Sequence, residues 1–420
     1  MAVKKVWFHV DVNSAFLSWS ALRLLQKGET LDLRTVPSAV GGNEEKRHGV
    51  VLAKSQAAKK YGIHTGESLF SARLKCPDLI VTPPDFDWYV QCSKGLIAIL
   101  NDYSPVVEQF SIDEAFVEMT GSEGLFGPPV EAADALRERV LRELGFTVNV
   151  GVSVNRLLAK TASDFEKPNR THTLWPEEVP KKLWPLPVGN LFGVGPSAVR
   201  TLDALGIHTV GDLAHADPEV LRGAFGVRGD SLRRHANGIE GTPLGKREVK
   251  DNSYGNSVTL PEDLTRPDQA DATLLALSES VAGRLRADGK TARVVTVQLV
   301  DNLFRRTSHQ TVLANPTNTT ETIYRTARQL IRQMWPHRPV RLVGVTAEKT
   351  SADQFEQLDL FTDAHHSDKQ EKLDRAADAL RSRFGDKAVV RARLLDPADK
   401  PVTPGALSAA KARDKRKKGQ

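Results

Sequence analysis

The chain of 420 residues is 40% hydrophobic and 26% charged, which is typical of about two to four folded domains and excludes an overall disordered or coiled-coil chain. Its only cysteines, Cys76 and Cys92, exclude a disulfide framework and a cysteine-based zinc site. The opening segment MAVKKVWFHVDV reaches an aspartate after a few apolar residues, too soon for a signal peptide or a membrane span. The sequence therefore predicts a cytoplasmic protein without a membrane partner.

The net charge of +6 is unevenly distributed along the chain. Residues 1–245 and 351–410 each carry a net charge of −2, whereas residues 246–350 and 411–420 each carry +5. Positive charge that is confined to one interior block and one terminal block indicates an anionic partner.

The first half of the chain mixes strands and helices. Alternating apolar residues predict a strand over 6–10 that ends at Asp11. Helices are expected over 14–27, 54–62, 67–75, 85–102 and 129–144. Extended segments are expected on both sides of the turn at 41–49, over 106–120 and over 146–153. This order predicts an α+β fold, with a sheet domain over 1–13 and 79–170 and a smaller insert over 14–78.

The second half contains two further modules. Prolines interrupt the chain before short helices expected over 188–238, and the polar stretch 241–252 is typical of a linker. Residues 253–350 predict a βαββαβ domain, with strands over 253–260, 292–300, 309–314 and 340–349 and helices over 267–289 and 321–335. A helix is expected over 369–384, and the last twenty residues are expected to be disordered.

Three carboxylates form the strongest chemical pattern: Asp11 in FHVDVNSAF, and Asp113 and Glu114 in EQFSIDEAF. Carboxylates from two neighbouring strands cannot all stay ionised without a counter-charge, and hard oxygen ligands suit Mg²⁺. Strand alternation places Glu114 on the face opposite Asp113, so a strand must begin or bend there. On spacing alone, solvated charges at a sheet edge are the alternative interpretation.

Five ordered segments carry a family resemblance: FHVDVNSAF, GVVLAKSQAAKKYGI, EQFSIDEAFVEMT, GVSVNRLLAKTASDFEKPN and LFGVGPSAVRTLDALGIHTVGDL. They resemble the Y-family (DinB/UmuC-type) translesion DNA polymerases, and among these the bacterial DNA polymerase IV group. The resemblance implies a right-hand polymerase with a palm (1–13 and 79–170), small fingers (14–78), a helix-hairpin-helix thumb (171–240), a linker (241–252), a little finger (253–350) and a tail (351–420). It further implies a monomer that performs low-fidelity, low-processivity synthesis on damaged templates.

The resemblance also assigns roles within the expected catalytic site. Asp11, Asp113, Glu114 and the backbone carbonyl of Val12 match the ligands of two Mg²⁺ ions. Phe16 matches an aromatic steric gate that excludes a ribose 2′-hydroxyl. Asn13 stands where many relatives have a second aspartate, which is not a core metal ligand.

Three residues match positions that grip the dNTP. They are Gln56, Lys59 and Lys160, of which Lys160 matches a lysine that contacts the β and γ phosphates. Gln56 replaces a tyrosine and Lys59 replaces an arginine of the family pattern, so the charge at position 59 is kept but the bidentate fork of arginine is lost.

Other matches concern DNA and a protein partner. Gly193 and Gly195 would form a hairpin whose backbone amides bind a DNA phosphate, and Lys290, Arg293, Arg305 and Arg306 would line the backbone of the primer-template duplex. Gln357, Leu358, Leu360 and Phe361 match the pentapeptide that binds the bacterial sliding clamp (β subunit). For the cluster Lys411, Arg413, Lys415, Arg416, Lys417 and Lys418, DNA binding and plain solvation are equally good interpretations.

Two rival functions remain open at this point. Some relatives have lost the metal-binding acids and act as clamp-bound accessory proteins without catalysis, a possibility that Gln56 and Lys59 keep open and the three acids oppose. A polymerase that tolerates ribonucleotides is disfavoured by Phe16.

Overall fold

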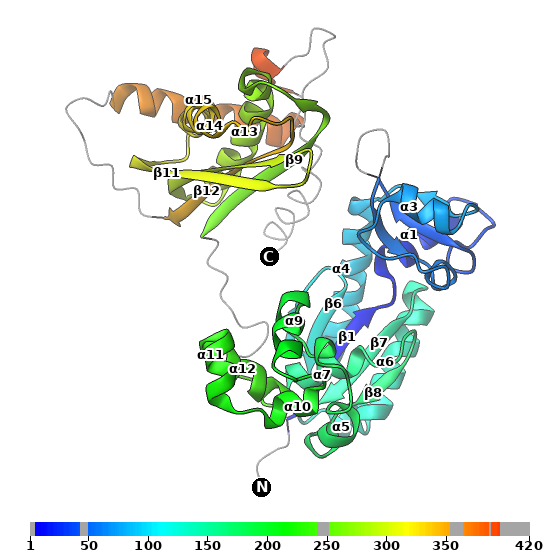
Figure 1. Ribbon diagram of the computed structural model, residues 1–420. Coiled ribbons are helices and arrows are strands. Elements are labelled where there is room, and N and C mark those ends of the chain that lie inside the picture. The colour runs from blue at the N-terminus through cyan, green and yellow to red at the C-terminus, as the bar shows by residue number, and fades with distance from the viewer. Residues whose placement is uncertain (1–4, 43–48, 242–251, 353–363, 386–387, 395–420) are drawn as a thin grey trace. The chain divides into compact units, whose positions relative to one another are not determined.

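The computed structural model describes residues 5–42, 49–241, 252–352, 364–385 and 388–394 (Figure 1). The chain divides into two compact units, one reaching from the N-terminal strand to Gly241 and the other beginning at Asn252 among the described residues. The expected linker thus falls at the boundary between the units. Within these ranges no helix is long and apolar enough to cross a membrane.

A five-stranded sheet in the order β5-β6-β1-β7-β8 is the centre of the first unit (Figure 1). Its strands are β1 (Trp7–Val12), β5 (Val107–Gln109), β6 (Glu114–Glu118), β7 (Val148–Ser153) and β8 (Thr171–Thr173). Apolar residues of β1, such as Phe8 and Val10, share a buried core with α4 (Phe86–Tyr103) and α6 (Pro129–Leu144). β8 was not expected, and it extends the sheet past residue 170, where the sheet domain was expected to end.

The run at 106–120 is a hairpin and not the single extended segment that the sequence suggested. β5 and β6 pair antiparallel, and the chain bends at 111–113 between them. The N–H groups of Phe110 and Ser111 both donate to the carbonyl of Glu114, at 2.9 and 3.1 Å. Because β6 begins at Glu114, the expected start or bend of a strand at the two acids is confirmed.

The other face of the sheet is covered by α7 (Arg156–Ser163), whose eight residues are all buried. A Cβ atom on Gly151 of β7 would lie 1.9 Å from the carbonyl oxygen of Ala159, so only glycine permits this close approach of helix and strand. Leu158 and Ala162 of α7 also belong to the core of the neighbouring helical module. The helix α7 is therefore shared by the sheet and that module.

The insert between β1 and α4 has a small sheet of its own, in the order β3-β2-β4. Its elements are α1 (Ala15–Gln26), β2 (Ser38–Gly41), β3 (Val51–Lys54), α2 (Gln56–Lys59), α3 (Leu69–Lys75) and β4 (Ile80–Thr82). The helix expected over 54–62 is only four residues long, because Lys54 belongs to β3 and the chain turns at Gly62, where φ is +70°.

The helical module follows β8, as expected from its prolines and glycines. Its principal helices are α9 (Pro196–Ala204), α10 (Val210–His215), α11 (Pro218–Phe225) and α12 (Val227–Ala236). Shorter helical elements between β8 and α9 are η1 (Pro176–Glu178), α8 (Val179–Lys182) and η2 (Val188–Asn190), of which α8 and η2 contribute Val179 and Val188 to the core of the module. The short helix α5 (Glu123–Phe126) precedes α6. The module has a single apolar core, which it completes with residues of α7.

The second unit has the βαββαβ order that the sequence predicted. Its strands β9 (Ser253–Leu264), β10 (Thr291–Asp301), β11 (Arg306–Thr317) and β12 (Val340–Ser351) form an antiparallel sheet in the order β11-β10-β12-β9. Residues of α13 (Asp271–Ala287) and α14 (Thr320–Met334) pack on Val295, Val297 and Leu299 of the central strand. Short 3₁₀ turns are η3 (Pro267–Ala270) and η4 (Ala392–Leu394).

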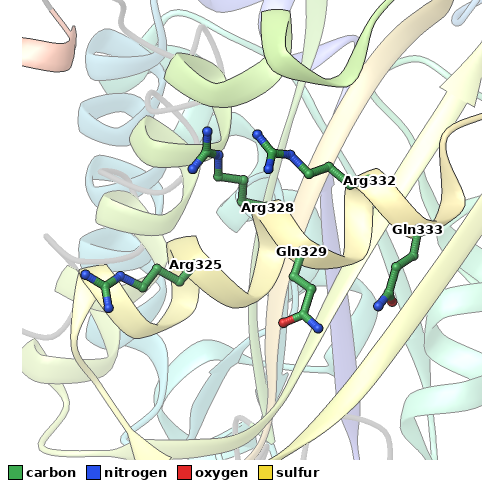
Figure 2. A pocket seen from close by; sticks show the side chains of 5 residues that line it. All are labelled: Arg325, Arg328, Gln329, Arg332 and Gln333. Carbon is green, nitrogen blue, oxygen red and sulfur yellow. The ribbon is translucent and has the colours of Figure 1, made fainter.

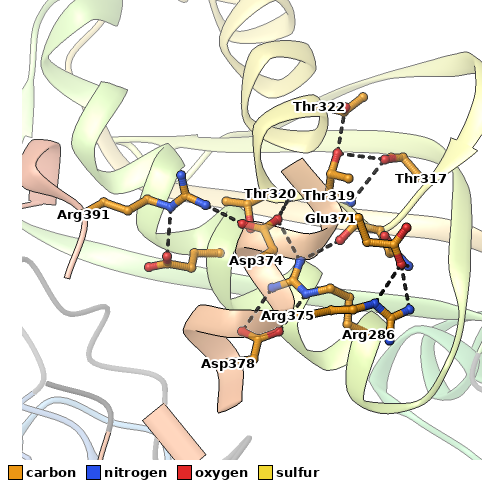
Figure 3. Close-up of polar contacts among 12 residues, drawn as sticks. Arg286, Thr317, Thr319, Thr320, Thr322, Glu371, Asp374, Arg375, Asp378 and Arg391 are labelled. Atoms are coloured by element: carbon orange, nitrogen blue, oxygen red, sulfur yellow. Dashed lines mark hydrogen bonds and ion pairs between the residues drawn. The ribbon is translucent and has the colours of Figure 1, made fainter. Parts of the chain in front are cut away.

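The C-terminal helix α15 (Ala364–Phe384) is joined to α13 and α14 by a buried ionic network (Figure 3). Arg286 of α13 donates to Asp374 at 3.1 Å and to Asp378 at 2.7 Å. Asp374 also accepts from the backbone N–H of Thr320 at 2.8 Å and from Arg391 at 2.5 Å. Since Arg286 and Asp374 are 7% and 2% exposed, the loss of either would leave the other, a buried charge, with fewer ion-pair partners.

Candidate active site

Strand register brings the three acids to one end of the central sheet. Asp11 and Glu114 are direct partners across β1 and β6, and the N–H of Val12 donates to the carbonyl of Asp113 at 3.0 Å. The expectation that acids from two neighbouring strands lie close together therefore holds in the backbone geometry. It follows from the hairpin bend, which places Asp113 and Glu114 opposite the end of β1.

A cavity of about 380 Å³ lies where β1 meets the insert. Asp11 and Asp113 supply its carboxylates, Phe16 its aromatic wall, and Gln56 a polar amide. Its cations are Lys54, Lys59 and Lys167, and its remaining lining residues are Val12, Asn13, Ser14, Ala15, Leu52, Ala53, Ser55 and Thr65. The cavity thus brings together Asp11, Val12, Phe16, Gln56, Lys59 and Asp113, which the sequence analysis assigned to one site.

The electrostatics of the acids reflect their burial and their lysine partners. Burial raises the pKa of Asp11 to about 6, against the opposing effect of the Lys167 ammonium with which it forms an ion pair. Burial also acts to raise the pKa of Glu114, but hydrogen bonds from His9 and Lys160 outweigh it and hold that pKa at about 2. Asp11, which is buried, and Glu114, which is half-buried, are therefore each compensated by a lysine of their own.

The donor set fits a hard divalent cation. Asp11, Asp113, Glu114 and the carbonyl of Val12 offer only oxygen atoms, as Mg²⁺ prefers. In the described part of the chain, however, no three acidic, histidine or cysteine side chains are gathered closely enough to hold an ion together. Asp11 forms an ion pair with Lys167, and Glu114 forms one with Lys160. Asp113 accepts a hydrogen bond from Ser111 Oγ at 2.5 Å. Metal binding therefore requires at least Asp11 and Asp113 to turn from their present partners.

Lys167 is a site residue that the sequence analysis missed. Lys160, which was expected to contact phosphates, does not line the cavity, and its Nζ lies 5.1 and 5.6 Å from the ring centroids of Phe110 and Phe192 while pairing with Glu114. Lys167 lines the cavity at the end of the same segment, GVSVNRLLAKTASDFEKPN. A second lysine seven residues after the first was the available signal.

Lysines of the insert form the other cationic wall. Burial, together with the neighbouring charge of Lys59, lowers the pKa of Lys54. Two ammonium groups that repel one another at a cavity wall are stabilised by an anion between them. Lys54 was not singled out by the sequence analysis, because a strand-end lysine has no distinctive pattern.

The ring of Phe16 is held rigidly at the cavity wall. It stacks on Tyr89 with a centroid distance of 4.7 Å and an interplanar angle of 12°, and it meets Phe86 edge to face. The hydroxyl of Tyr89 is in turn hydrogen-bonded to Ser20 at 2.6 Å. A ring fixed in this way can act as a steric boundary.

Asn13 anchors the loop that carries Lys167. Its Oδ1 accepts from the backbone N–H of Asn169 at 2.8 Å, and its Nδ2 donates to Oδ1 of Asn149 at 3.1 Å. Asn149 in turn donates to the carbonyls of Ser163 and Glu166. An aspartate at position 13 could not donate to Asn149, so the departure from the family pattern has a structural use in this chain.

The expected DNA-binding residues lie on exposed parts of both units. Gly193 has a φ of +93°, which suits a tight hairpin, and Gly195 directly precedes α9. Both glycines are exposed. Arg293 is exposed on β10, whereas Lys290 precedes that strand with its Nζ 5.5 Å from the ring centroid of Tyr254.

Arg306 begins β11, but Arg305 lies in the turn before it, which corrects the expectation that both are on a strand. Gln357, Leu358, Leu360, Phe361 and the terminal basic cluster lie outside the described residues.

A second pocket, of about 360 Å³, lies on the outer face of α14 (Figure 2). It is lined by Arg325, Arg328, Gln329, Arg332 and Gln333. No carboxylate lines it, and two of its arginines already form ion pairs, with Glu321 and Asp271. It therefore lacks the mixture of acids, cations and a fixed aromatic ring that marks the first cavity.

Comparisons with known proteins give a consistent result. The impB/mucB/samB family matches residues 10–164, its C-terminal domain matches residues 251–360, and the IMS family HHH motif matches residues 176–207. The chain is 42% identical over 399 residues to a DNA polymerase IV of Clostridium acetobutylicum, covering 95% of this chain and 100% of that protein. It is 37% identical over 406 residues to a DNA polymerase IV 2 of Bacillus subtilis, covering 95% and 96%.

A solved structure supports the same architecture. The fold is similar to that of a Y-family DNA polymerase chimera, Dbh-Dpo4(243-245)-Dbh, with a TM-score of 0.70 and 23% identity over 82% of this chain and 98% of that one. At this identity the likeness concerns the fold alone.

The position of Lys167 leads to a test against Lys160. Lys167→Ala should raise the Kd for a nucleoside triphosphate by about tenfold or more, since a charge-assisted contact contributes roughly 1.5–3 kcal/mol. Lys160→Ala should raise that Kd by a smaller factor, because its ammonium pairs with Glu114 and does not line the cavity. Binding of a fluorescent dNTP analogue to the complex with DNA measures both, with Lys94→Ala on the exposed side of α4 as control. The reverse order of effects would support the phosphate role expected for Lys160 and remove that of Lys167.

Proposed function

The chain belongs to the impB/mucB/samB family of Y-family, DinB-type DNA polymerases, and from this membership we propose that its first cavity is the centre of a two-metal, low-fidelity translesion polymerase. It is a DNA-directed DNA polymerase, with palm, fingers, helix-hairpin-helix thumb and little finger. The palm is the five-stranded sheet with its helices, and the fingers are the insert that carries Lys54 and Lys59.

One observation carries the proposal for the site. A single cavity joins two carboxylates of the palm, Asp11 and Asp113, to three lysines and to the fixed ring of Phe16. Carboxylates bind divalent cations and lysines bind phosphates, so the cavity has binding groups for both the metal and the triphosphate of a metal-nucleotide complex. An adaptor protein would have no use for this combination.

Each residue has a defined part in the proposed reaction. Two Mg²⁺ ions held by Asp11, Asp113, Glu114 and the Val12 carbonyl would supply activation of the primer 3′-hydroxyl and stabilisation of charge on the triphosphate. Lys54, Lys59 and Lys167 bind the phosphates as point charges, and Gln56 donates a neutral hydrogen bond. Phe16 occupies the space beside the sugar and excludes a 2′-hydroxyl.

DNA would be held through its backbone alone. The hairpin at Gly193 and Gly195 offers backbone N–H groups to a phosphate, and the open face of the little-finger sheet offers Arg306, Ser308 and Gln310 on alternate positions of β11. Such contacts carry no sequence information, which suits a polymerase that must accept any template.

Primer extension tests the catalytic assignment. Asp113→Ala should reduce extension of a labelled primer with dNTPs and Mg²⁺ by at least about 10³-fold, because it removes a carboxylate that would hold the catalytic metal ions. Asp134→Ala, on the exposed side of α6, is the matched control and should extend normally.

The rival function predicts a different result. If neither the wild type nor Asp134→Ala extends a primer while both bind DNA, the chain is a non-catalytic accessory protein in damage tolerance. Extension that survives Asp113→Ala would instead remove Asp113 from the metal site.

Sugar selection tests the role of Phe16. Phe16→Ala should raise the rate of rNTP incorporation relative to dNTP by about 10- to 100-fold, because the ring that meets the 2′-hydroxyl is gone. Single-nucleotide insertion kinetics give the ratio. Phe126→Ala, which removes a ring stacked on Tyr103 instead, should leave it unchanged. Equal ratios in all three proteins would remove the steric-gate assignment.

We also propose that the motif Gln357, Leu358, Leu360 and Phe361 binds the bacterial sliding clamp, with glutamine as a polar anchor and the apolar side chains as a plug. Leu360→Ala with Phe361→Ala should abolish stimulation by the clamp and leave synthesis on a short primer intact. The exposed Leu373→Ala on α15 is the control. Loss of both activities in the double variant would show that the segment belongs to the fold.

A further inference from the structure

We propose that His9 is a positioning residue, which holds one oxygen of the Glu114 carboxylate so that the other oxygen stays free for a metal ion. The proposal rests on the proposed function, because it concerns one of the three metal-binding acids. His9 lies on β1 two residues before Asp11 and is completely buried. A histidine in the core of a sheet needs a partner for each ring nitrogen, and one of the two partners of His9 is a proposed metal-binding acid.

The ring of His9 bridges two elements of the palm. Its Nε2 lies 3.2 Å from Oε2 of Glu114 on β6, and its Nδ1 lies 2.7 Å from Oγ of Ser163 on α7. Phe116, the register partner of His9 across β1 and β6, fixes one side of the ring at a centroid distance of 4.7 Å. The ring therefore has little freedom to rotate, and its two hydrogen bonds have fixed directions.

The direction of the hydrogen bond to Glu114 follows from the atoms involved. An ionised carboxylate can only accept, so Nε2 of His9 must carry the hydrogen that points to Oε2. The Ser163 hydroxyl has one hydrogen, which is directed either to Nδ1 or to the carbonyl of Lys160 at 2.8 Å. In either case Nε2 remains the donor to Glu114.

The side chain of Glu114 makes both of its hydrogen bonds through the same oxygen. His9 Nε2 and Lys160 Nζ each donate to Oε2, and Oε1 has no hydrogen-bond partner within the part of the chain that is described. Two donors that converge on one oxygen fix the plane of the carboxylate and leave the other oxygen free as a ligand. Lys160 supplies the compensating charge, and His9 supplies the direction.

Hydrogen bonds of this kind affect metal affinity without contact to the metal. Groups that orient a ligand through its second oxygen or nitrogen change metal affinity or activity by about 10- to 100-fold when they are removed. If the replacement is polar and fits the same space, the loss of His9 should therefore lower the affinity for the metal and leave the thermal stability of the fold nearly unchanged.

Two substitutions separate the hydrogen bond from packing. His9→Gln places an amide nitrogen at the reach of Nε2 and can still donate to Glu114, whereas His9→Asn reaches only to the position of Nδ1 and Ser163. The affinity for Mn²⁺, measured by electron paramagnetic resonance on the complex with dideoxy-terminated primer-template and dNTP, is the readout. Thermal unfolding and DNA affinity are measured in parallel on the same proteins.

The expected result is a split between the two variants. His9→Asn should weaken Mn²⁺ binding by about tenfold, and His9→Gln should stay within about threefold of the wild type, at similar Tm and DNA affinity. Equal Mn²⁺ affinity in all three proteins, or equal losses in both variants, would overturn the positioning role. Ser163→Ala, which frees Nδ1 and keeps His9, should weaken Mn²⁺ binding about twofold or more, and it decides the question if the histidine variants do not fold.

Failure of the proposed function would appear elsewhere in the same experiment. If the wild type binds no Mn²⁺ that Asp113→Ala removes, the metal assignment itself fails, and the role of His9 fails with it. If wild-type binding is present and only the His9 and Ser163 variants behave like the wild type, the proposed function stands and the inference about His9 does not.

Discussion

The end of the palm that we propose as the catalytic site depends on one electrostatic constraint, the juxtaposition of a buried and a half-buried carboxylate on neighbouring strands. Asp11 and Glu114 face each other across β1 and β6, and neither can remain ionised there without a cation. Lys167 and Lys160 meet that need. The elements that carry these lysines, α7 and the loop after it, must therefore lie against the end of the sheet, and Gly151 permits α7 to come that close.

The same constraint connects the acids to the thumb. Lys160 pairs with Glu114 while its ammonium lies over Phe110 and over Phe192, which directly precedes the hairpin glycine Gly193. Because α7 also contributes Leu158 to the thumb core, the helix is rigidly shared by the two parts. A displacement of the hairpin at Gly193 would consequently reach Glu114 through Lys160.

The sequence predicted most elements of the fold and the acidic part of the site, because both depend on local patterns. Alternation and helix signals located the strands and helices, and the segments around Asp11, Asp113 and Phe16 carried family motifs. The bend at the two acids was expected, but the pairing of β5 with β6 across it was not. β8 and the position of Lys167 escaped prediction, since each depends on a contact with a segment farther away in the sequence. Asn13 shows the same limit, because its partners Asn149 and Asn169 are far away in sequence.

A lysine of the cavity can exchange one anionic partner for another. Lys167 forms an ion pair with Asp11 in this structure. A single ammonium group cannot pair equally strongly with a carboxylate and a phosphate. It can turn to a triphosphate only when another cation compensates Asp11, so binding of nucleotide and of divalent metal should be mutually dependent. Lys59 strengthens this dependence, because a lysine in place of arginine holds the phosphate as a point charge without a fixed geometry. The orientation of the triphosphate then rests more heavily on the carboxylates, and hence on the residues that hold them in place.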